Sequence, residues 1–442
     1  MALSGLDIYK LLPKTNCREC GFATCLAFAM QLVKKSTTID KCPYVSKESK
    51  DIIESQSEPP IKTIILKNKD YSFKVGGETV LFRHEEKFHN PCALGFILED
   101  SLTDNEIKDR VDKINALGFE RVGQTLKANI IVVEQKGGAQ RFIEVVRLVS
   151  DITQLAIGII FKDLKALEGS LAYLKDKKPL VYYNGKEDLI AIAKAIKDIE
   201  ASLVVSADSL DTLSGLAGEL NKSGYKDIVL EIKGSSISDN IWNLTQARRL
   251  ALKKNQRSLG FPFLVIVSAK SPYEEAMEAA TYITKYASIV LISNFSVFEV
   301  LPLLTLRQNI YTDPQKPLQI EPKVYSVGAV SNKSPVLVTT NFSLSYFTVL
   351  GEVEASKVPS YIVSIDTEGM SVLTAWAAEK FTPKRIADSL EKYKVRGLIS
   401  HNCLIIPGYV SVMSGDLKEA SGFNITVGPK EAAGIPSFLK NL

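Results

Sequence analysis

The sequence predicts an α/β protein built from a small N-terminal cysteine-rich module, a central TIM (β/α)8 barrel and a C-terminal Rossmann-like domain. Three observations lead to this prediction. Four of the six cysteines fall in the first tenth of the chain. Eight short apolar runs then alternate with helical patterns, and a proline-rich crossing separates them from a second, shorter α/β rhythm. A chain of 442 residues has room for about three domains.

Composition limits the classes of partner. The 54 Lys and Arg residues nearly balance the 50 Asp and Glu residues, and a net charge of +4 gives no basic surface for nucleic acid. The most apolar long stretch, residues 289–306, contains Asn294, Glu299 and Pro302, so we expect no membrane span. Asp7 and Lys10 lie where a signal peptide needs apolar residues. We therefore expect a cytoplasmic protein with neither nucleic acid nor membrane as a partner.

The first module, residues 1–58 with its linker, holds the cysteines between two helical patterns at residues 3–12 and 24–35. The spacing is Cys17-x2-Cys20-x4-Cys25-x16-Cys42. In a reducing compartment such a cluster indicates metal binding rather than disulfide bonds. Structural zinc sites more often use two C-x2-C knuckles, whereas iron–sulfur clusters accept unequal spacings.

The helix after Thr24 adds to this interpretation. Thr24 can cap a helix that starts at Cys25, which would place that thiolate where helix N-terminal amides favour negative charge. The sequence therefore predicts that Cys17, Cys20, Cys25 and Cys42 bind a [4Fe-4S] cluster. A zinc site and plain structural cysteines are the alternatives.

The central domain, residues 59–312, follows a polar stretch at residues 46–62 that we interpret as a linker. A β-hairpin is expected within residues 63–88, with Gly76-Gly77 between its two strands. Eight strand–helix units follow, the number that closes a TIM barrel, and an open doubly wound sheet is the competing arrangement. The expected barrel strands are residues 93–98, 130–133, 155–160, 180–183, 203–205, 228–232, 263–267 and 289–292.

Polar residues end these strands, where barrel enzymes carry their chemistry. The span from the first barrel strand to the last domain contains no histidine, and polar residues end strands in most proteins, so we expect a scaffold or docking surface and assign no catalytic residue. The candidates are Glu99, Asp100, Glu134, Lys162, Asp163, Asn184, Asp208, Glu231, Ser268 and Asn294.

The C-terminal domain, residues 313–442, repeats the alternation on a smaller scale. We expect buried strands at residues 336–339, 361–365, 398–400 with 404–406, and 425–427. Helical patterns lie between them at residues 344–355, 371–380, 383–393 and 417–420.

Taken in order, the CRECGFATCLAFA run with its distant KCPY, the eight-unit barrel and the small α/β domain resemble the large (gamma) subunit of the corrinoid iron–sulfur protein of the reductive acetyl-CoA pathway. The resemblance covers essentially the whole chain. The cysteine run alone is less specific, because electron-transfer subunits of membrane-bound ferredoxin oxidoreductases carry a similar one.

The resemblance implies a methyl carrier of an anaerobic carbon-fixation system rather than a stand-alone catalyst. Cobalamin in the C-terminal domain would accept a methyl group from methyltetrahydrofolate on Co(I), and the [4Fe-4S] cluster would reactivate Co(II). The implied partners are a smaller barrel subunit in a heterodimer, a methyltetrahydrofolate corrinoid methyltransferase, acetyl-CoA synthase/carbon monoxide dehydrogenase and a reductive activator. The alternatives are an iron–sulfur electron-transfer subunit without corrinoid and a barrel methyltransferase with an accessory cluster.

The cobalt ligand can also be predicted from the sequence. The chain lacks the D-x-H-x-x-G signature of many corrinoid proteins, and its only C-terminal imidazole, His401, follows Ile399 rather than Asp at the matching position. We therefore expect base-off cobalamin without a histidine ligand, and a partly buried His401 with satisfied ring nitrogens.

Four loops at the expected carboxyl ends of the C-terminal strands are the candidate corrinoid contacts. The loop at residues 366–374 is the richest, because Gly369 permits close approach and its hydroxyls can meet corrin amides; a well-capped helix explains the same residues without a ligand. The candidate residues are Thr339, Thr340, Asn341, Ser343, Thr367, Gly369, Met370, Ser371, Val372, Leu373, Thr374, Ile406, Pro407, Gly408, Gly428, Pro429 and Gly434.

Overall fold

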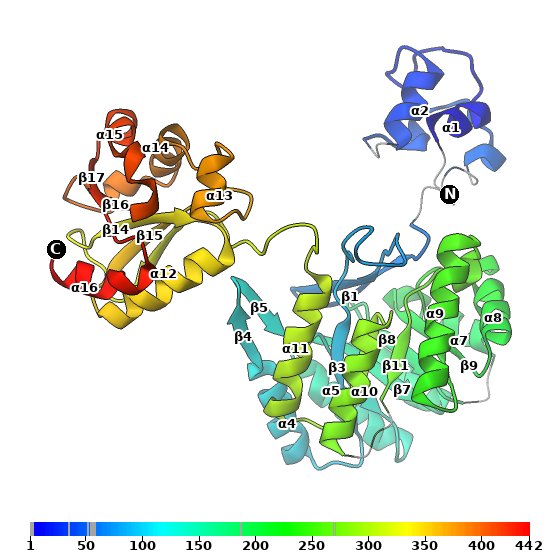
Figure 1. Cartoon of the computed structure of the whole chain (residues 1–442). Coiled ribbons are helices and arrows are strands. Elements are labelled where there is room, and N and C mark those ends of the chain that lie inside the picture. Colours follow the sequence, from blue (N-terminus) through cyan, green and yellow to red (C-terminus); the bar gives the residue numbers. More distant parts are fainter. Residues whose placement is uncertain are drawn as a thin grey trace. The chain divides into compact units, whose positions relative to one another are not determined.

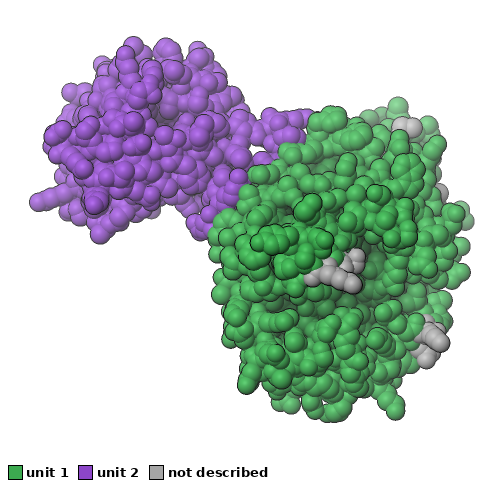
Figure 2. Space-filling model, turned by 60° about the horizontal axis from the view of Figure 1, so that its bottom comes forward, with its two compact units in different colours: residues 1–119, 126–311 green, residues 120–125, 312–442 purple. Residues whose placement is uncertain are grey.

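A computed structural model describes residues 4–33, 36–50, 53, 59–185, 188–267, 269 and 271–442. Two compact units make up the chain, one of residues 1–119 and 126–311 and the other of residues 120–125 and 312–442 (Figure 2). Within the described ranges, none of the helices combines the length and the apolar character needed to cross a bilayer. The predicted linker lies in part outside the described residues.

The described part of the N-terminal module includes two short helices and a 3-10 turn. Helix α1 (Gly5–Leu11) begins with a capping box, in which Ser4 and Asp7 satisfy each other's backbone N–H groups. Helix α2 (Cys25–Val33) begins at the predicted cysteine, and turn η1 (Ile39–Lys41) leads to Cys42. Ile8, Phe28 and Ala29 pack with Cys25 and Cys42 in one small core.

A hairpin of β1 (Thr63–Asn68) and β2 (Tyr71–Gly76) precedes the barrel. The predicted position of the hairpin turn, at Gly76-Gly77, is wrong. The chain turns at Lys69 and Asp70, and Lys69 adopts a left-handed φ of 51°. Gly76 instead ends the second strand, where a Cβ would lie 2.2 Å from the carbonyl oxygen of Lys62. The glycine is therefore required by a close backbone approach rather than by a turn.

All eight predicted barrel strands are present, and they form one parallel sheet of order β10-β9-β8-β7-β6-β3-β12-β11 (Figure 1). Strands β10 and β11 meet only at the bridge between Leu230 and Phe263, which makes the barrel nearly closed. The strands are β3 (Ala93–Glu99), β6 (Ile130–Glu134), β7 (Ala156–Phe161), β8 (Leu180–Tyr183), β9 (Ser202–Ala207), β10 (Ile228–Ile232), β11 (Leu264–Ile266) and β12 (Ile289–Ile292).

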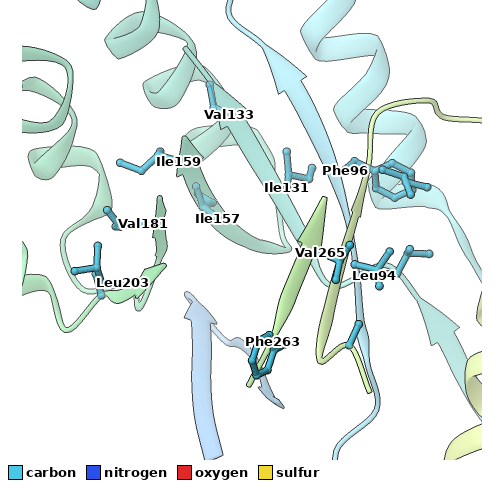
Figure 3. Close-up of a cluster of buried hydrophobic side chains, with 14 of the residues drawn as sticks. Leu94, Phe96, Ile131, Val133, Ile157, Ile159, Val181, Leu203, Phe263 and Val265 are labelled. Atoms are coloured by element: carbon cyan, nitrogen blue, oxygen red, sulfur yellow. The ribbon is translucent and has the colours of Figure 1, made fainter. Parts of the chain in front are cut away.

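Side chains alternate between two apolar layers of the barrel. In β3, Ala93 and Ile97 belong to the cluster of the lumen. Leu94 and Phe96 belong to the cluster between the strands and the surrounding helices (Figure 3). Val75 of the hairpin joins the lumen cluster. The helices are α4 (Asp104–Ala116), α5 (Ala139–Ile152), α6 (Leu164–Leu174), α7 (Leu189–Ala195) with η2 (Lys197–Ile199), α8 (Leu210–Lys222), α9 (Ile237–Lys253) with η3 (Arg257–Leu259), α10 (Pro272–Thr284) and α11 (Val297–Tyr311).

A small hairpin that the sequence analysis does not predict interrupts the first barrel unit. It consists of β4 (Gly118–Arg121) and β5 (Gln124–Lys127). Apart from Leu126, its side chains are exposed or half-buried, so it lacks the apolar run that identifies the barrel strands.

The C-terminal sheet has the order β13-β15-β14-β16-β17. Strands β14 (Val336–Thr340), β15 (Ser360–Ile365), β16 (Cys403–Ile406) and β17 (Asn424–Val427) are parallel, and β13 (Val324–Val327) adds an antiparallel edge. The strand expected at residues 398–400 is absent, because the 3-10 turn η4 (Val395–Gly397) leads into a bend there. Strand β15 lies on one side of β14 and β16 on the other, so the strand order changes direction at β14.

Helices cover this sheet, and the longest of them follows β14. They are α12 (Ser343–Ser356), α13 (Val372–Ala377), α14 (Pro383–Lys392), α15 (Ser414–Ser421) and α16 (Ile435–Lys440), with 3-10 turns η5 (Gly408–Met413) and η6 (Ala432–Gly434). Two apolar clusters, one containing Val338 and Ile386 and the other Leu337 and Ile435, form the core of the unit.

Candidate functional site

The loop before α2 has an unusual backbone. Lys14, Asn16, Arg18 and Gly21 all adopt left-handed φ angles, between 48° and 83°. Residues that alternate between left-handed and ordinary conformations point successive N–H groups into one concavity, an arrangement found at phosphate and iron–sulfur sites. The Cys17 and Cys20 thiols lie within this loop.

The other two cysteines are buried beside it. Cys25 is the first residue of α2, and its N–H donates to Asn16 Oδ1 at 2.8 Å. The predicted Thr24 cap is present, since Thr24 Oγ1 accepts the N–H of Ala27 at 3.1 Å. All six cysteines are free thiols. Cys25 thus lies at the N-terminus of α2, where the helix dipole favours negative charge, and Cys42 is buried in the same small core.

The donor set can be compared with the two kinds of metal group. In the part of the chain that the structure describes, no three His, Cys, Asp or Glu side chains converge to hold a single metal ion. A four-iron cluster makes a different demand, because each of its irons takes a thiolate at its own corner. The ligand roles of Cys17, Cys20, Cys25 and Cys42 stay a prediction.

The C-terminal sheet has an apolar pocket of about 310 Å³ at the carboxyl ends of its strands. This is the edge where parallel α/β sheets bind ligands, and the pocket lies at β14 and β16, where the strand order changes direction. We call it the C-terminal pocket. It is lined by Leu337, Val338, Thr339, Phe342, Leu344, Ser345, Thr348, Val349, Ser371, Val372, Ile405, Ile406, Pro407, Tyr409, Gly428, Pro429, Lys430, Ala432 and Ile435.

Asn341, just after β14, organises the loops around the C-terminal pocket. Its side-chain oxygen accepts three hydrogen bonds, from Thr367 N–H at 2.9 Å, Thr367 Oγ1 at 3.0 Å and Gly369 N–H at 3.0 Å. Its amide nitrogen donates to Gln319 and Asp366 at 3.2 Å each. One fully buried amide therefore fixes the loop that the sequence identifies as the richest candidate.

Two further observations favour a ligand at this edge. The hydroxyl oxygens of Thr340, Ser343 and Ser364 are buried, and none of them has a hydrogen-bond partner in the described structure. Buried polar atoms without partners are rare in native proteins unless something else satisfies them. At Gly408, a Cβ would lie 2.6 Å from the Gly428 carbonyl oxygen, so the two pocket loops meet backbone to backbone.

The predicted contacts divide into three groups. Seven line the C-terminal pocket: Thr339, Ser371, Val372, Ile406, Pro407, Gly428 and Pro429. Seven others support its loops from behind or lie buried beside them: Thr340, Asn341, Ser343, Thr367, Gly369, Met370 and Gly408. Leu373 is exposed, Thr374 bonds to Ser371 Oγ at 2.9 Å, and a Cβ on Gly434 would contact Pro429.

The wall formed by α12 was not predicted from the sequence. Leu344, Ser345, Thr348 and Val349 lie on this helix, whereas the rule for parallel sheets directs attention to loops. The spacing 344, 345, 348 and 349 places these four residues on one helix face, and this signal could have been used.

A rim of exposed apolar side chains accompanies the C-terminal pocket. Leu344, Leu373, Trp376, Tyr409 and Val412 are between 43% and 75% exposed, which is high for side chains of this size. Tyr409 donates a hydrogen bond to Glu431, and this bond raises the pKa of Tyr409. Such a rim offers apolar contact to a large flat ligand or to another protein surface.

His401 lies at the opposite edge of the sheet. Cys403 N–H donates to His401 Nδ1 at 3.2 Å, and His401 Nε2 lies 3.0 Å from the Ser334 carbonyl oxygen. Because Nδ1 accepts, Nε2 carries the proton and donates it. Both ring nitrogens are therefore occupied by backbone, as expected from the sequence.

At the barrel, several predicted candidates have structural roles. Asp100 accepts the N–H groups of Lys136 at 2.8 Å and Gly137 at 2.9 Å, and Asp163 caps α6. Glu134 pairs with Lys136 at 2.8 Å. Glu231, in the lumen, accepts hydrogen bonds from Tyr182 and, at 2.7 Å, from Ser206. Ser268 lies outside the described residues.

Two buried carboxyl groups lie beside the end of β12. Glu275 accepts the N–H groups of Ser293 at 2.7 Å and Asn294 at 3.0 Å, so this loop is held from α10. Glu299 is 1% exposed and lies against Glu275. Burial, followed by the neighbouring Glu275, raises the pKa of Glu299 to about 8. A protonated Glu299 can donate to Glu275, which explains how two acids share this space.

Comparison with known proteins gives matches along the whole chain. The family model described as CO dehydrogenase/acetyl-CoA synthase delta subunit matches residues 63–439, and a model for an Fe-S cluster matches residues 12–44. The chain is 40% identical to the corrinoid/iron-sulfur protein large subunit of Moorella thermoacetica, covering 100% of this chain and 99% of that one.

A second relative is the acetyl-CoA decarbonylase/synthase complex subunit gamma of Methanothermobacter thermautotrophicus, with 34% identity over 100% of this chain and 99% of that one. The delta-subunit model leaves out the cysteine module, whereas these two relatives include it. Among solved structures, a dihydropteroate synthase from Coxiella burnetii matches 57% of this chain and 100% of its own, with 11% identity and a TM-score of 0.41.

Proposed function

We propose that this chain, which belongs to the family of corrinoid/iron–sulfur protein large subunits and acetyl-CoA decarbonylase/synthase gamma subunits, is a corrinoid methyl carrier with a [4Fe-4S] cluster for reductive reactivation. It would accept a methyl group that a methyltransferase takes from methyltetrahydrofolate and deliver it to acetyl-CoA synthase. The observation that carries the proposal is an apolar pocket at the carboxyl ends of the C-terminal strands, with unpaired hydroxyls buried beside its lining.

The C-terminal pocket suits the lower side of a base-off cobalamin. Its apolar walls on β14, β16 and α12 offer a place for the displaced aromatic base, and the Ser343 and Thr340 hydroxyls are free to meet polar groups of the nucleotide tail. The exposed Leu373 and Trp376 on α13 would contact the corrin ring. No imidazole of residues 313–442 lies at this edge, since their one histidine, His401, is tied to backbone at the other end of the sheet.

When bound, the corrinoid supplies a cobalt that takes up and releases the methyl group, and the cluster supplies single electrons. The protein's part is to position these groups. The loop with left-handed residues between Lys14 and Gly21, together with the N-terminus of α2, would surround the anionic cluster with N–H groups. Asn341 would hold the corrin-facing loop in one conformation.

The proposed partners follow from the same roles: a smaller barrel subunit in a heterodimer, the methyltransferase, acetyl-CoA synthase/carbon monoxide dehydrogenase and a reductive activator. The exposed apolar rim around the C-terminal pocket supports this, because side chains such as Trp376 and Val412 are common in surfaces that another protein covers.

Absorbance spectra with cobalt and iron analysis of the anaerobically purified full chain test the proposal. We expect one cobalt and four irons per chain, with corrinoid bands in addition to the broad iron–sulfur absorption. Iron without cobalt in cells that make corrinoid would instead support an iron–sulfur electron-transfer subunit.

Variants of the cysteines test the cluster separately. In Cys42→Ala, reductive rescue of Co(II) should be lost while methyl transfer from previously methylated protein persists, because the proposed cluster serves repair rather than each turnover. Cys403→Ala is the matched control, since this thiol lies on β16 rather than in the N-terminal module. Normal rescue in Cys42→Ala would contradict the role of the cluster.

A further inference from the structure

The first turn of α12 brings two backbone N–H groups to the C-terminal pocket. The N–H groups at the start of a helix have no partner within the helix. In α12, the N–H of Ser343 donates to the Leu318 carbonyl oxygen at 2.9 Å. Those of Leu344 and Ser345 have no hydrogen-bond partner in the described part of the chain. Both residues line the C-terminal pocket, which therefore meets the positive end of the helix dipole.

The start of α12 also lacks a side-chain cap. Its N-cap residue is Phe342, which has no side-chain oxygen to accept these N–H groups. Ser343, the first residue of the helix, is 6% exposed, and its hydroxyl oxygen is buried without a partner among the described residues. Such a hydroxyl is rare in native proteins unless a further group binds it. The N-terminus of α12 thus has several hydrogen-bond donors that the protein itself does not use.

Lys430 adds a positive charge to the C-terminal pocket. Of the described residues that line the pocket, Lys430 alone is charged, and it is exposed. The adjacent acid in the sequence, Glu431, accepts a hydrogen bond from Tyr409. An anion in the pocket is therefore attracted both by Lys430 and by the N-terminus of α12, and it meets no carboxylate among the lining residues.

The apolar walls define the rest of the ligand. Most of the lining is aliphatic, with Leu337 and Ile406 on the strands and Val349 on α12. A bare inorganic anion gains nothing from such walls, whereas a phosphate ester that carries a flat aromatic group uses both parts of the pocket. The nucleotide tail of cobalamin has this chemistry, because a phosphodiester links its aromatic base to the corrin ring.

We propose that the N-terminus of α12 and Lys430 form an anion subsite for the phosphodiester in the nucleotide tail of the corrinoid. The inference rests on the proposed function and makes it more specific, because it predicts which corrinoids the chain selects. The N–H groups of Leu344 and Ser345 donate to phosphate oxygens, and the Lys430 ammonium supplies the counter-charge. Cobinamide has the corrin ring without the phosphodiester and the base, so it gains nothing from this subsite.

Equilibrium dialysis of the full chain, produced in cells that lack corrinoid, tests the subsite. Cob(II)alamin and cob(II)inamide are the probes under anaerobic conditions, and their absorbance gives the bound fraction. In Lys430→Met, the dissociation constant of cob(II)alamin should rise at least about tenfold, while that of cob(II)inamide should change less than about twofold. Lys418→Met is the matched control, since this exposed lysine on α15 does not line the pocket, and it should bind both probes as the wild type does.

Ser345→Asp tests the N-terminus of α12 in the same way. An acidic residue in the first turn of a helix suits the helix dipole, so the variant should fold. Its carboxylate repels a phosphate, and cob(II)alamin should again bind at least about tenfold more weakly. The affinity for cob(II)inamide should stay within about twofold of the wild type.

Three outcomes would overturn the inference. Equal changes for the two corrinoids in both variants, or no change for either, would do so and leave the proposed function intact. Binding of adenosine monophosphate that depends on Lys430, with equal affinities for the two corrinoids, would assign the subsite to a free nucleotide. If neither corrinoid bound to the wild type, the proposed function itself would be wrong, and the subsite with it.

Discussion

At the carboxyl ends of the barrel strands, acidic side chains bind other groups of the same protein: Asp100 accepts two backbone N–H groups and Glu134 pairs with Lys136. At the same ends of the C-terminal strands, an apolar pocket opens and the Thr340 and Ser343 hydroxyls have no described partner. In both regions, parallel strands alternate with helices along the chain. A sheet edge that binds a ligand therefore differs from a purely structural one in how many of its polar groups lack a partner within the protein.

The largest expected effect comes from closing the C-terminal pocket. Ser345 lies on the α12 wall, and Ser345→Trp would fill the space proposed for the displaced base. We expect retained cobalt to fall more than about tenfold, equivalent to about 1.4 kcal/mol of binding free energy or more. Cobalt analysis of protein purified in parallel measures it.

Glu134→Gln at the barrel is the matched control for that variant. It should keep its cobalt, because we propose no corrinoid contact there. Full cobalt in folded Ser345→Trp would show that the C-terminal pocket is not the corrinoid site, and the contrast between the two edges would lose its functional meaning.

The second prediction compares the residues that organise each edge. Asn341→Ala removes the acceptor of three hydrogen bonds and leaves buried N–H groups unpaired, so we expect the unfolding free energy to fall by about 2–4 kcal/mol. Asp100→Ala should destabilise the barrel in the same way. Only Asn341→Ala should also weaken cobalt retention, measured together with thermal unfolding. Equal cobalt loss in both variants would mean that the loss reflects stability alone.

The third expected effect is smaller: the stability of the barrel should depend on pH through Glu299. The pKa of Glu299 is about 8 in the folded protein and near 4.5 when unfolded, so between these values the native state binds more protons than the unfolded state. Stability from protonated Glu299 is full below about pH 4.5 and is lost as pH rises toward 8.

Glu299→Gln should remove this dependence, because an amide stays neutral. Its melting temperature relative to wild type should rise by several degrees or more between pH 5 and pH 9, as followed by circular dichroism. Glu352→Gln, on α12, should show no such trend. A pH-independent difference for Glu299→Gln would argue against a shared proton with Glu275.

The smallest effect is expected at His401. Both of its nitrogens are bound by backbone at the edge away from the C-terminal pocket, so His401→Ala should leave the electron paramagnetic resonance spectrum of the Co(II) form unchanged. The spectrum should show no splitting from an axial nitrogen in either protein. Splitting that disappears in the variant would identify His401 as a cobalt ligand and contradict the base-off proposal.

Apolar run length was enough to predict the barrel. All eight strands, from Ala93–Glu99 to Ile289–Ile292, are buried on both faces and appear in the sequence as continuous apolar stretches. The position of the hairpin turn could not be predicted from the glycines. Gly76 is needed where two backbone segments come close together, and the turn contains Lys69 instead. Strands β4 and β5 carry no apolar run at all.

The candidate site was predictable where strand ends define it and less so elsewhere. Thr339, Ile406 and Gly428 follow from the rule for parallel sheets. The role of Asn341 needs the structure, because its five hydrogen bonds join four residues from two segments that are far apart in the sequence, Gln319 and residues 366–369.

The single bridge between Leu230 and Phe263 has a consequence for amide exchange with solvent. The Leu230 N–H donates to the Pro262 carbonyl oxygen at 2.9 Å, whereas the other pairs of neighbouring barrel strands are held by longer ladders. Deuterium should therefore replace the Leu230 amide proton through local separation of β10 and β11, well before it reaches Ile131 or Val132. The barrel would open to water along one seam while the rest of the ring stays closed.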